Sequence, residues 1–190
     1  MDESRIITIF KDSGALLTGH FQLSSGLHSD RYLQCALVLQ FPKIAEELCR
    51  ALASRWTAAG IQTVIGPALG GIIVAHELAR ALGARCLFME RQEGQMTLRR
   101  HFTVSPGEKV LLAEDVVTTG VSVKEIIRHM EKENTSVAGV AALVNRSGGN
   151  PFGTLRFEPL LVIPPHQFDP KDCPMCKRGE PIYAPGSRRL

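Results

Sequence analysis

Short apolar runs alternate with segments of helical periodicity through the middle of the chain. The apolar runs are TVIG (63–66), RCLFM (85–89), KVLLA (109–113), VAGVAALV (137–144) and LLVI (160–163). Apolar residues recur at helical spacing after the first and third of these runs, near 72–82 and 121–133. Short uninterrupted runs are typical of strands buried on both faces, and strands that alternate with helices form parallel sheets. The pattern predicts an α/β fold with a central, mainly parallel sheet flanked by helices.

The first sixty residues have a different pattern. Residues 3–13 mix apolar and charged positions, which predicts a short helix that ends at Gly14. Residues 15–40 contain glycines and alternating stretches, which indicate irregular β structure or a hairpin. A helix is expected over 42–59, because apolar residues recur there at helical spacing between an initial proline and Gly60.

Two segments lack clear periodicity. Residues 90–104 (ERQEGQMTLRRHFTV) are polar and basic and lie between two predicted strands. A loop of this length inside a compact domain is usually a functional lid or disordered. Eight of the eleven prolines lie from Pro151 onward, which indicates a segment that wraps over the surface, with residues 187–190 frayed.

Composition narrows the class of protein. A chain of 190 residues is expected to form one domain. The net charge of +3 is too mild to indicate a nucleic-acid or membrane surface, and no stretch approaches the roughly 18 apolar residues of a membrane helix. The first ten residues lack the basic start and apolar run of a secretory signal. The five cysteines, mostly in apolar segments, fit a reducing cytoplasm.

The segment VLLAEDVVTTGVS (110–122) carries the most specific chemistry. An apolar strand leads into Glu114 and Asp115, then into a Thr-Thr-Gly turn and a helix. Adjacent carboxylates can accept hydrogen bonds from vicinal sugar hydroxyls or hold a hydrated Mg²⁺. The hydroxyl and N–H groups of residues 118–122, at the start of a helix, suit a phosphate. The segment predicts a ribose 5-phosphate site; the alternative is an ordinary capped helix preceded by solvated acids.

This segment resembles the phosphoribosyl-pyrophosphate (PRPP) motif of type I phosphoribosyltransferases. The chain has neither a Walker loop nor a dinucleotide-binding fingerprint. Four other segments resemble parts of the orotate phosphoribosyltransferase family. The N-terminal hood of that family resembles GHFQLSSGLHSDRYLQ (19–34), and its pyrophosphate turn and following helix resemble IGPALGGIIVAHELA (65–79). Its strand-end arginine segment resembles ALVNRSGG (142–149), and the C-terminal tail of one bacterial branch resembles CPMCKRGEPIYAPGSR (173–188).

The resemblance implies a fold, a reaction and partners. The fold would be that of type I phosphoribosyltransferases: a core over about 41–165, a hood from about 1–40 plus the C-terminal segment, and a mobile lid over about 91–104. The reaction would join orotate and PRPP to give orotidine 5′-monophosphate and pyrophosphate, with Mg²⁺ held mainly by PRPP near the acid pair. The family's lid reaches into the neighbouring subunit's site, which implies a homodimer.

The resemblance also assigns roles to individual residues. PRPP would be bound by one lid arginine and by the whole PRPP loop: Arg91, Glu114, Asp115, Val116, Val117, Thr118, Thr119, Gly120, Val121 and Ser122. Orotate would contact Ser24, Tyr32, Thr118 and Arg146, because a guanidinium can bind a planar carboxylate through two hydrogen bonds. Asp115 would be catalytic together with the lid residues Arg99, Arg100 and His101, which would meet the pyrophosphate.

Some features leave alternatives open. Better-known members carry lysines where this chain has Ser24, Gly70 and Gln92. Cys173 and Cys176 form a single C-x-x-C pair, which supplies two of the four ligands that zinc needs; His166 is the nearest candidate for a third, and a structural pair of thiols is favoured. A purine phosphoribosyltransferase and a PRPP-sensing regulator remain alternative functions.

Overall fold

A computed structural model describes residues 1–23 and 25–185. Its core is a six-stranded sheet in the order β5-β4-β3-β6-β7-β8, parallel except for the antiparallel pair β4–β5. The strands are β3 (Thr63–Pro67), β4 (Arg85–Gln92), β5 (Gln95–Leu98), β6 (Lys109–Val117), β7 (Ser136–Asn145) and β8 (Phe157–Val162). The predicted α/β class and each of the five apolar strands are confirmed.

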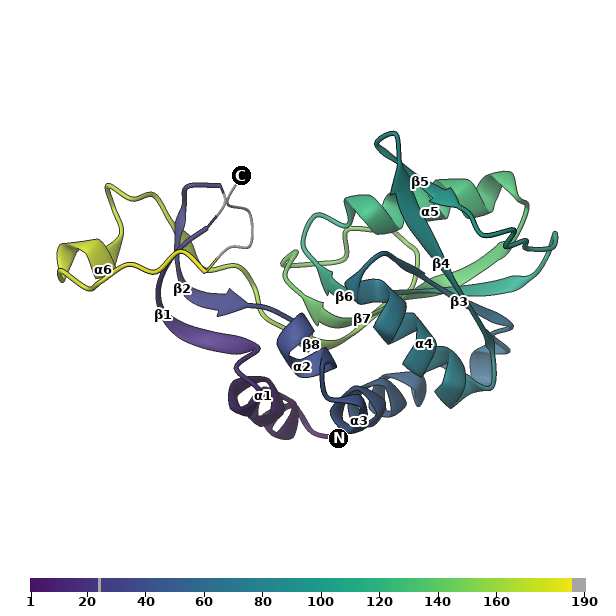
Figure 1. The fold of residues 1–190 in the computed structure, drawn as a ribbon, viewed down its shortest axis with the longest axis horizontal. Helices are drawn as coiled ribbons and strands as arrows, with labels where there is room; N and C mark the ends of the chain where they lie inside the picture. Colours follow the sequence, from purple (N-terminus) through teal and green to yellow (C-terminus); the bar gives the residue numbers. More distant parts are fainter. Residues whose placement is uncertain (24, 186–190) are drawn as a thin grey trace.

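Helices cover both faces of this sheet (Figure 1). On one face, α3 (Pro42–Ala53) and α4 (Gly70–Leu82) bury Leu48 and Leu78 against the strands. On the other face, α5 (Val121–Lys132) buries Ile126. The helix expected over 42–59 ends earlier, at Ala53, and a short 3₁₀ turn, η1 (Thr57–Ala59), follows it.

A smaller unit, the hood, stands beside the core at the left of Figure 1. Its sheet has the order β1-β2-β9, with β1 (Leu16–Gln22) and β2 (His28–Leu33) forming the predicted hairpin and β9 (Gln167–Phe168) added antiparallel to β2. The predicted first helix is α1 (Glu3–Asp12). Two four-residue helices complete this part of the chain: α2 (Ala36–Leu39) and α6 (Pro174–Lys177).

The segment 90–104 is not a continuous loop. Strand β4 runs on to Gln92 and turns through Glu93 and Gly94 into β5. Both turn residues have positive φ angles, 48° and 81°, as the tightest hairpin turns require. Met96 is buried on β5. The prediction of a loop is therefore wrong for residues 90–98, because strand pairing and the burial of one side chain order them.

Strand β6 is longer than its apolar run. Pairing with β7 continues past Ala113 through Glu114 to Val117, which is opposite Asn145. The acid pair therefore belongs to the last residues of a central strand and not to the loop after it. Among the described residues, no helix combines the length and the apolar content that crossing a bilayer requires.

Candidate active site

Two loops meet where the strand connections change direction. Strand β3 lies between β4 and β6. The chain therefore runs from β3 to β4 on one side of β3 and later continues into β6 on the opposite side. In open α/β sheets, ligands bind at the carboxyl ends of the strands at such a switch point. The turn 66–71 follows β3 and the PRPP loop ends β6, so both predicted phosphate-binding segments lie at this position.

The turn after β3 passes directly over the acid pair. A Cβ added to Gly70 would lie 2.3 Å from Asp115 Oδ2, and one added to Gly71 would lie 3.1 Å from Glu114 Oε1. Within the turn, a Cβ on Gly66 would meet the carbonyl oxygen of Gly71 at 2.1 Å. Only glycine permits this approach, so the turn, weak evidence by its sequence alone, belongs to the site.

The two carboxyl groups of the acid pair are held by backbone N–H groups. The Asp115 N–H donates to Glu114 Oε1 (3.1 Å), and the Val116 N–H donates to Asp115 Oδ1 (2.8 Å). Burial, with the neighbouring Asp115 carboxylate, raises the pKa of Glu114 to about 9. Glu114 is therefore protonated at neutral pH in the ligand-free protein. Sugar hydroxyls or a cation at this position would favour the charged form.

A small pocket of about 90 Å³ lies at the end of β6 and the start of α5, lined by Glu114 and residues 116–123. The N-cap of α5 is Gly120, in the left-handed conformation (φ 71°), and no side chain caps the helix. Within the described residues, the hydroxyls of Thr118, Thr119 and Ser122 have no protein hydrogen-bond partner. The helix is therefore not capped by a side chain, and these hydroxyl groups are available to a ligand.

On the side toward the hood, Arg146 follows β7 and donates its backbone N–H to the Val117 carbonyl (2.7 Å). Its Nε is buried and has no hydrogen-bond partner in the described part of the chain. Burial lowers the pKa of Arg146, and the nearby Cys35 thiol and Tyr32 phenol oppose that effect. Tyr32 lies at the end of β2, so hood and core meet here. A buried guanidinium donor without a partner suits an anionic ligand.

The four lid residues do not join this cluster in the same chain. Arg91 donates to the Gly94 carbonyl and to Glu125 on α5 (3.2 Å), and Arg100 makes a two-pronged pair with Glu90 (2.9 and 3.0 Å). Arg99 and His101 are exposed at the end of β5. Strand β5 is three strands from β6, or roughly 14 Å at the usual strand spacing.

The structure thus gathers some predicted residues and separates others. Glu114–Ser122, Arg146 and Tyr32 are brought together, while Arg99, Arg100 and His101 are not; Ser24 lies outside the described residues. Lys124 was missed by sequence reasoning: its Nζ donates to the Thr119 carbonyl (3.0 Å), which places an ammonium beside the pocket. Its position four residues after Gly120, in the first turn of a helix, was the available signal.

His166 is not a partner of the C-x-x-C pair. Its Nδ1 lies 2.8 Å from Asp30 Oδ2, whereas Cys173 and Cys176 lie beside His20 and His28. The prediction of His166 as the third ligand is therefore wrong. Nothing in the local sequence pairs residues of β1 and β2 with a segment about 150 positions away.

The fold and the acid pair followed by a phosphate-sized pocket define a phosphoribosyltransferase. A model of the phosphoribosyl transferase domain matches residues 38–152. The chain is 53% identical over 190 residues to the orotate phosphoribosyltransferase of Pelotomaculum thermopropionicum, with 100% of each chain covered. The chain belongs to the orotate phosphoribosyltransferase family.

Solved structures agree with the fold. The crystal structure of orotate phosphoribosyltransferase from Aeropyrum pernix has a TM-score of 0.69 and 24% identity, over 83% of this chain and 93% of that one. Adenine phosphoribosyltransferase from Rhodothermus marinus also has a TM-score of 0.69, with 18% identity over 85% and 100%. Structures named for orotate and for adenine enzymes therefore share this fold.

Proposed function

We propose that this chain transfers the phosphoribosyl group from PRPP to orotate, giving orotidine 5′-monophosphate and pyrophosphate. One observation supports this most: the acid pair and the unsatisfied hydroxyls of the PRPP loop lie at the sheet's switch point, and the partnerless Nε of Arg146 lies beside them. The full-length relative named as an orotate enzyme supports the choice of base.

The PRPP loop would hold the reacting sugar. Hydroxyl and N–H donors of Thr118–Ser122 would bind the 5′-phosphate, with Lys124 adding positive charge. Glu114 and Asp115 would accept hydrogen bonds from the ribose hydroxyls. Breaking the anomeric C–O bond builds positive charge on the ring, which these carboxylates stabilise, and negative charge on pyrophosphate, which faces N–H groups of the glycine turn.

Orotate would lie between core and hood. The Arg146 guanidinium would bind its carboxylate, which gives the buried Nε an acceptor. Thr118, Tyr32 and Ser24 would border the ring. Held in this way, the ring nitrogen meets the anomeric carbon in line with the departing pyrophosphate, so positioning supplies much of the rate enhancement.

Magnesium fits this site as a companion of PRPP. Two adjacent carboxyl groups supply the oxygen atoms that Mg²⁺ prefers, and burial beside a second acid raises the pKa of Glu114, so a cation would relieve the repulsion. When bound with PRPP, the ion would neutralise pyrophosphate oxygens. Glu114 and Asp115 would orient the ribose hydroxyls next to it, with no direct metal ligand required from the chain.

The lid residues would act in a neighbouring subunit. Arg99, Arg100 and His101 lie at the outer strand of the sheet, with Arg91 on β4 beside them, so a homodimer is the arrangement that brings them to pyrophosphate. Arg99 and Arg100 would neutralise the leaving group and His101 would protonate it. We propose a cytoplasmic enzyme whose partners are its two substrates and a second copy, with no nucleic-acid or membrane partner.

Replacing Asp115 tests the assignment. We expect Asp115→Asn to lower kcat/KM for orotate by at least about tenfold, equivalent to about 1.4 kcal/mol of transition-state stabilisation. The assay follows the loss of orotate absorbance in the presence of PRPP and Mg²⁺. Asp12→Asn, at the exposed end of α1, is the matched control and should match the wild type.

Two outcomes would contradict the proposed reaction, and a third would contradict the role of Asp115. Turnover of adenine or hypoxanthine in place of orotate would favour the purine alternative. PRPP binding without turnover of any base would favour a sensor. An Asp115→Asn variant as active as the wild type would remove this carboxylate from the mechanism.

A further inference from the structure

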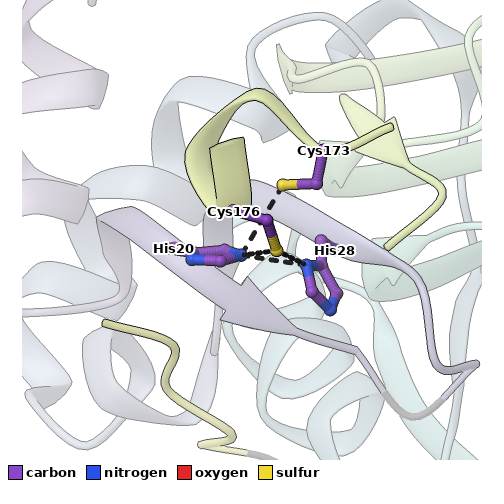
Figure 2. Close-up of side chains that lie close together, drawn as sticks. All are labelled: His20, His28, Cys173 and Cys176. Atoms are coloured by element: carbon purple, nitrogen blue, oxygen red, sulfur yellow. Dashed lines mark hydrogen bonds between the residues drawn. The ribbon is translucent and has the colours of Figure 1, made fainter. Parts of the chain in front are cut away.

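Four potential metal ligands converge in the hood, away from the active site. His20 on β1, His28 on β2, and Cys173 and Cys176 at α6 have ligand atoms that all lie within 4.8 Å of one another. Figure 2 shows the four side chains pointing toward a common centre. His20, His28 and Cys173 are buried, with exposed fractions of 3%, 6% and 0%. Polar groups buried in this way need partners for their donor and acceptor atoms.

The spacing of the ligand atoms suits tetrahedral zinc. With Zn–S bonds of about 2.3 Å and Zn–N bonds of about 2.0–2.1 Å, sulfur and nitrogen ligands lie about 3.6 Å apart. The Sγ atoms of Cys173 and Cys176 each lie 3.6 Å from His20 Nε2, and Cys176 Sγ lies 3.3 Å from His28 Nδ1. The two nitrogens are 2.9 Å apart and the ligand atoms lie up to 4.8 Å from one another, so side chains of the cluster would shift on binding before all pairs reach tetrahedral spacing.

Hydrogen bonds among the four groups do not account for this arrangement. His20 Nδ1 lies 3.0 Å from the Glu180 carbonyl, which accepts its proton, so Nε2 carries a single lone pair. Three groups approach that nitrogen within 3.6 Å: His28 Nδ1, Cys173 Sγ and Cys176 Sγ. One lone pair cannot accept three such bonds. The Glu180 carbonyl holds the His20 ring in one orientation by accepting its Nδ1 proton. Histidines that bind a metal through one ring nitrogen are commonly oriented by such an acceptor on the other nitrogen.

We infer that His20, His28, Cys173 and Cys176 bind one structural Zn²⁺. Two sulfur and two nitrogen ligands in a tetrahedron favour zinc over Mg²⁺ or Ca²⁺, which take oxygen ligands. Four protein ligands leave no open position, so the ion would not be catalytic. As the two Zn–S bonds form, both thiol protons pass to solvent and no electron is transferred. The inference does not depend on the proposed function.

Such an ion would join the short helix α6 to the hairpin formed by β1 and β2. Helix α6 has four residues and β9 has two. The following chain is attached to β1 by the Tyr183 N–H to the His20 carbonyl (2.9 Å) and the Gln22 N–H to the Tyr183 carbonyl (2.8 Å). Elements this short are not stable by themselves. The ion would tie α6 to both long hood strands, and β2 is also the strand that carries Tyr32.

Metal analysis of the untagged full-length chain, purified under reducing conditions, tests the site. We expect about one zinc per chain by mass spectrometry of the metal content. Removing zinc with a chelator should lower Tm by at least about 5 °C, and Zn²⁺ but not Mg²⁺ should restore it. Cobalt-loaded protein should show the intense visible bands of a tetrahedral site and a thiolate-to-cobalt band in the near ultraviolet.

The double variant Cys173→Ser/Cys176→Ser should hold less than about a tenth of an equivalent of zinc. Cys86→Ser is the matched control, because Cys86 lies on β4 in the core, and it should keep the full equivalent. The inference fails if the wild type holds less than about a tenth of an equivalent after incubation with zinc and gel filtration. It also fails if the cobalt protein lacks the thiolate band, a result that does not depend on whether the double variant folds.

Discussion

Glu114 and Arg146 occupy half-buried positions in which the charged form of each side chain is disfavoured. Burial raises the pKa of Glu114 and lowers that of Arg146, and the Arg146 Nε has no partner within the described residues. Each would be better satisfied by a substrate than by the protein: Glu114 by sugar hydroxyls or a cation, and Arg146 by a carboxylate. The site is therefore poised for its ligands at a cost to the stability of the ligand-free chain.

The raised pKa of Glu114 makes the free energy of unfolding depend on pH. Between its ordinary pKa of 4.5 and about 9, the folded protein holds a proton that the unfolded chain releases. Raising the pH through this window lowers stability, by at most about 1.4 kcal/mol per pH unit. We expect Tm to fall more steeply in the wild type than in Glu114→Gln between about pH 6 and about pH 8.5, as measured by calorimetry.

The comparison uses protein without PRPP or Mg²⁺, because either would favour the charged carboxylate. Glu133→Gln, at the exposed end of α5, serves as the control and should follow the wild type. Equal slopes for the wild type and Glu114→Gln would show that Glu114 is not protonated in the folded chain.

At the scale of elements, the β4–β5 hairpin depends on one carboxylate of α5. Glu125 accepts the Met96 N–H (3.1 Å) on one oxygen and Arg91 (3.2 Å) on the other. Strand β5 has only four residues and lies at the edge of the sheet. The basic segment, residues 99–101, follows β5 directly. The position of this segment therefore depends on how β5 is anchored. The hairpin and α5 should therefore move as one unit.

Replacing Glu125 should loosen the hairpin. In Glu125→Ala, both contacts are lost, and hydrogen exchange of amides over 92–98 should accelerate at least about threefold. Exchange in β6 should not change. Glu133→Ala, at the exposed C-terminal end of α5, is the matched control, because no contact links Glu133 to the hairpin in the described residues. Unchanged exchange over 92–98 would show that strand pairing alone holds β5.

At the scale of the whole molecule, the proposed substrate site draws on both hood and core, while strand β5, which precedes the basic segment 99–101, lies at the edge of the core sheet (Figure 1). Tyr32 comes from the hood and Arg146 from the core. Arg99 directly follows β5, which lies three strand spacings, or roughly 14 Å, from β6, the strand that carries the acid pair. A symmetric dimer would bring the basic segment of each copy to the site of the other, so each site would draw on two chains.

Mixing two inactive variants tests this arrangement. Asp115→Asn removes the acid of one chain's site, and Arg99→Ala removes the cation supplied to the other. Random mixing makes half of the dimers hybrids of the two variants. If Arg99 acts across the dimer, one of the two sites in each hybrid has both Asp115 and Arg99. Activity should then recover to about a quarter of that of the wild type. The measurement is orotate turnover after co-refolding. No recovery above the separate variants would mean that Arg99 acts within its own chain.

The parallel α/β core and the position of the PRPP loop could both be predicted from the sequence. Both depend on local patterns: uninterrupted apolar runs that only a buried strand explains, and an acid pair that must stand where such a strand ends. Arg146 was identifiable for the same reason, since it directly follows an apolar strand. The hood hairpin was expected from alternation and glycines over 15–40.

Which distant residues meet could be seen only in the folded chain. Polar residues 90–98 form a hairpin because β4 and α5 offer hydrogen-bond partners, and the glycine turn joins the site because it lies against Asp115. Cys173 and Cys176 find His20 and His28, not the nearer His166, because the chain returns across the hood strands. Local periodicity reports which face of an element is apolar, but contacts between elements depend on how the connections bring them together in space.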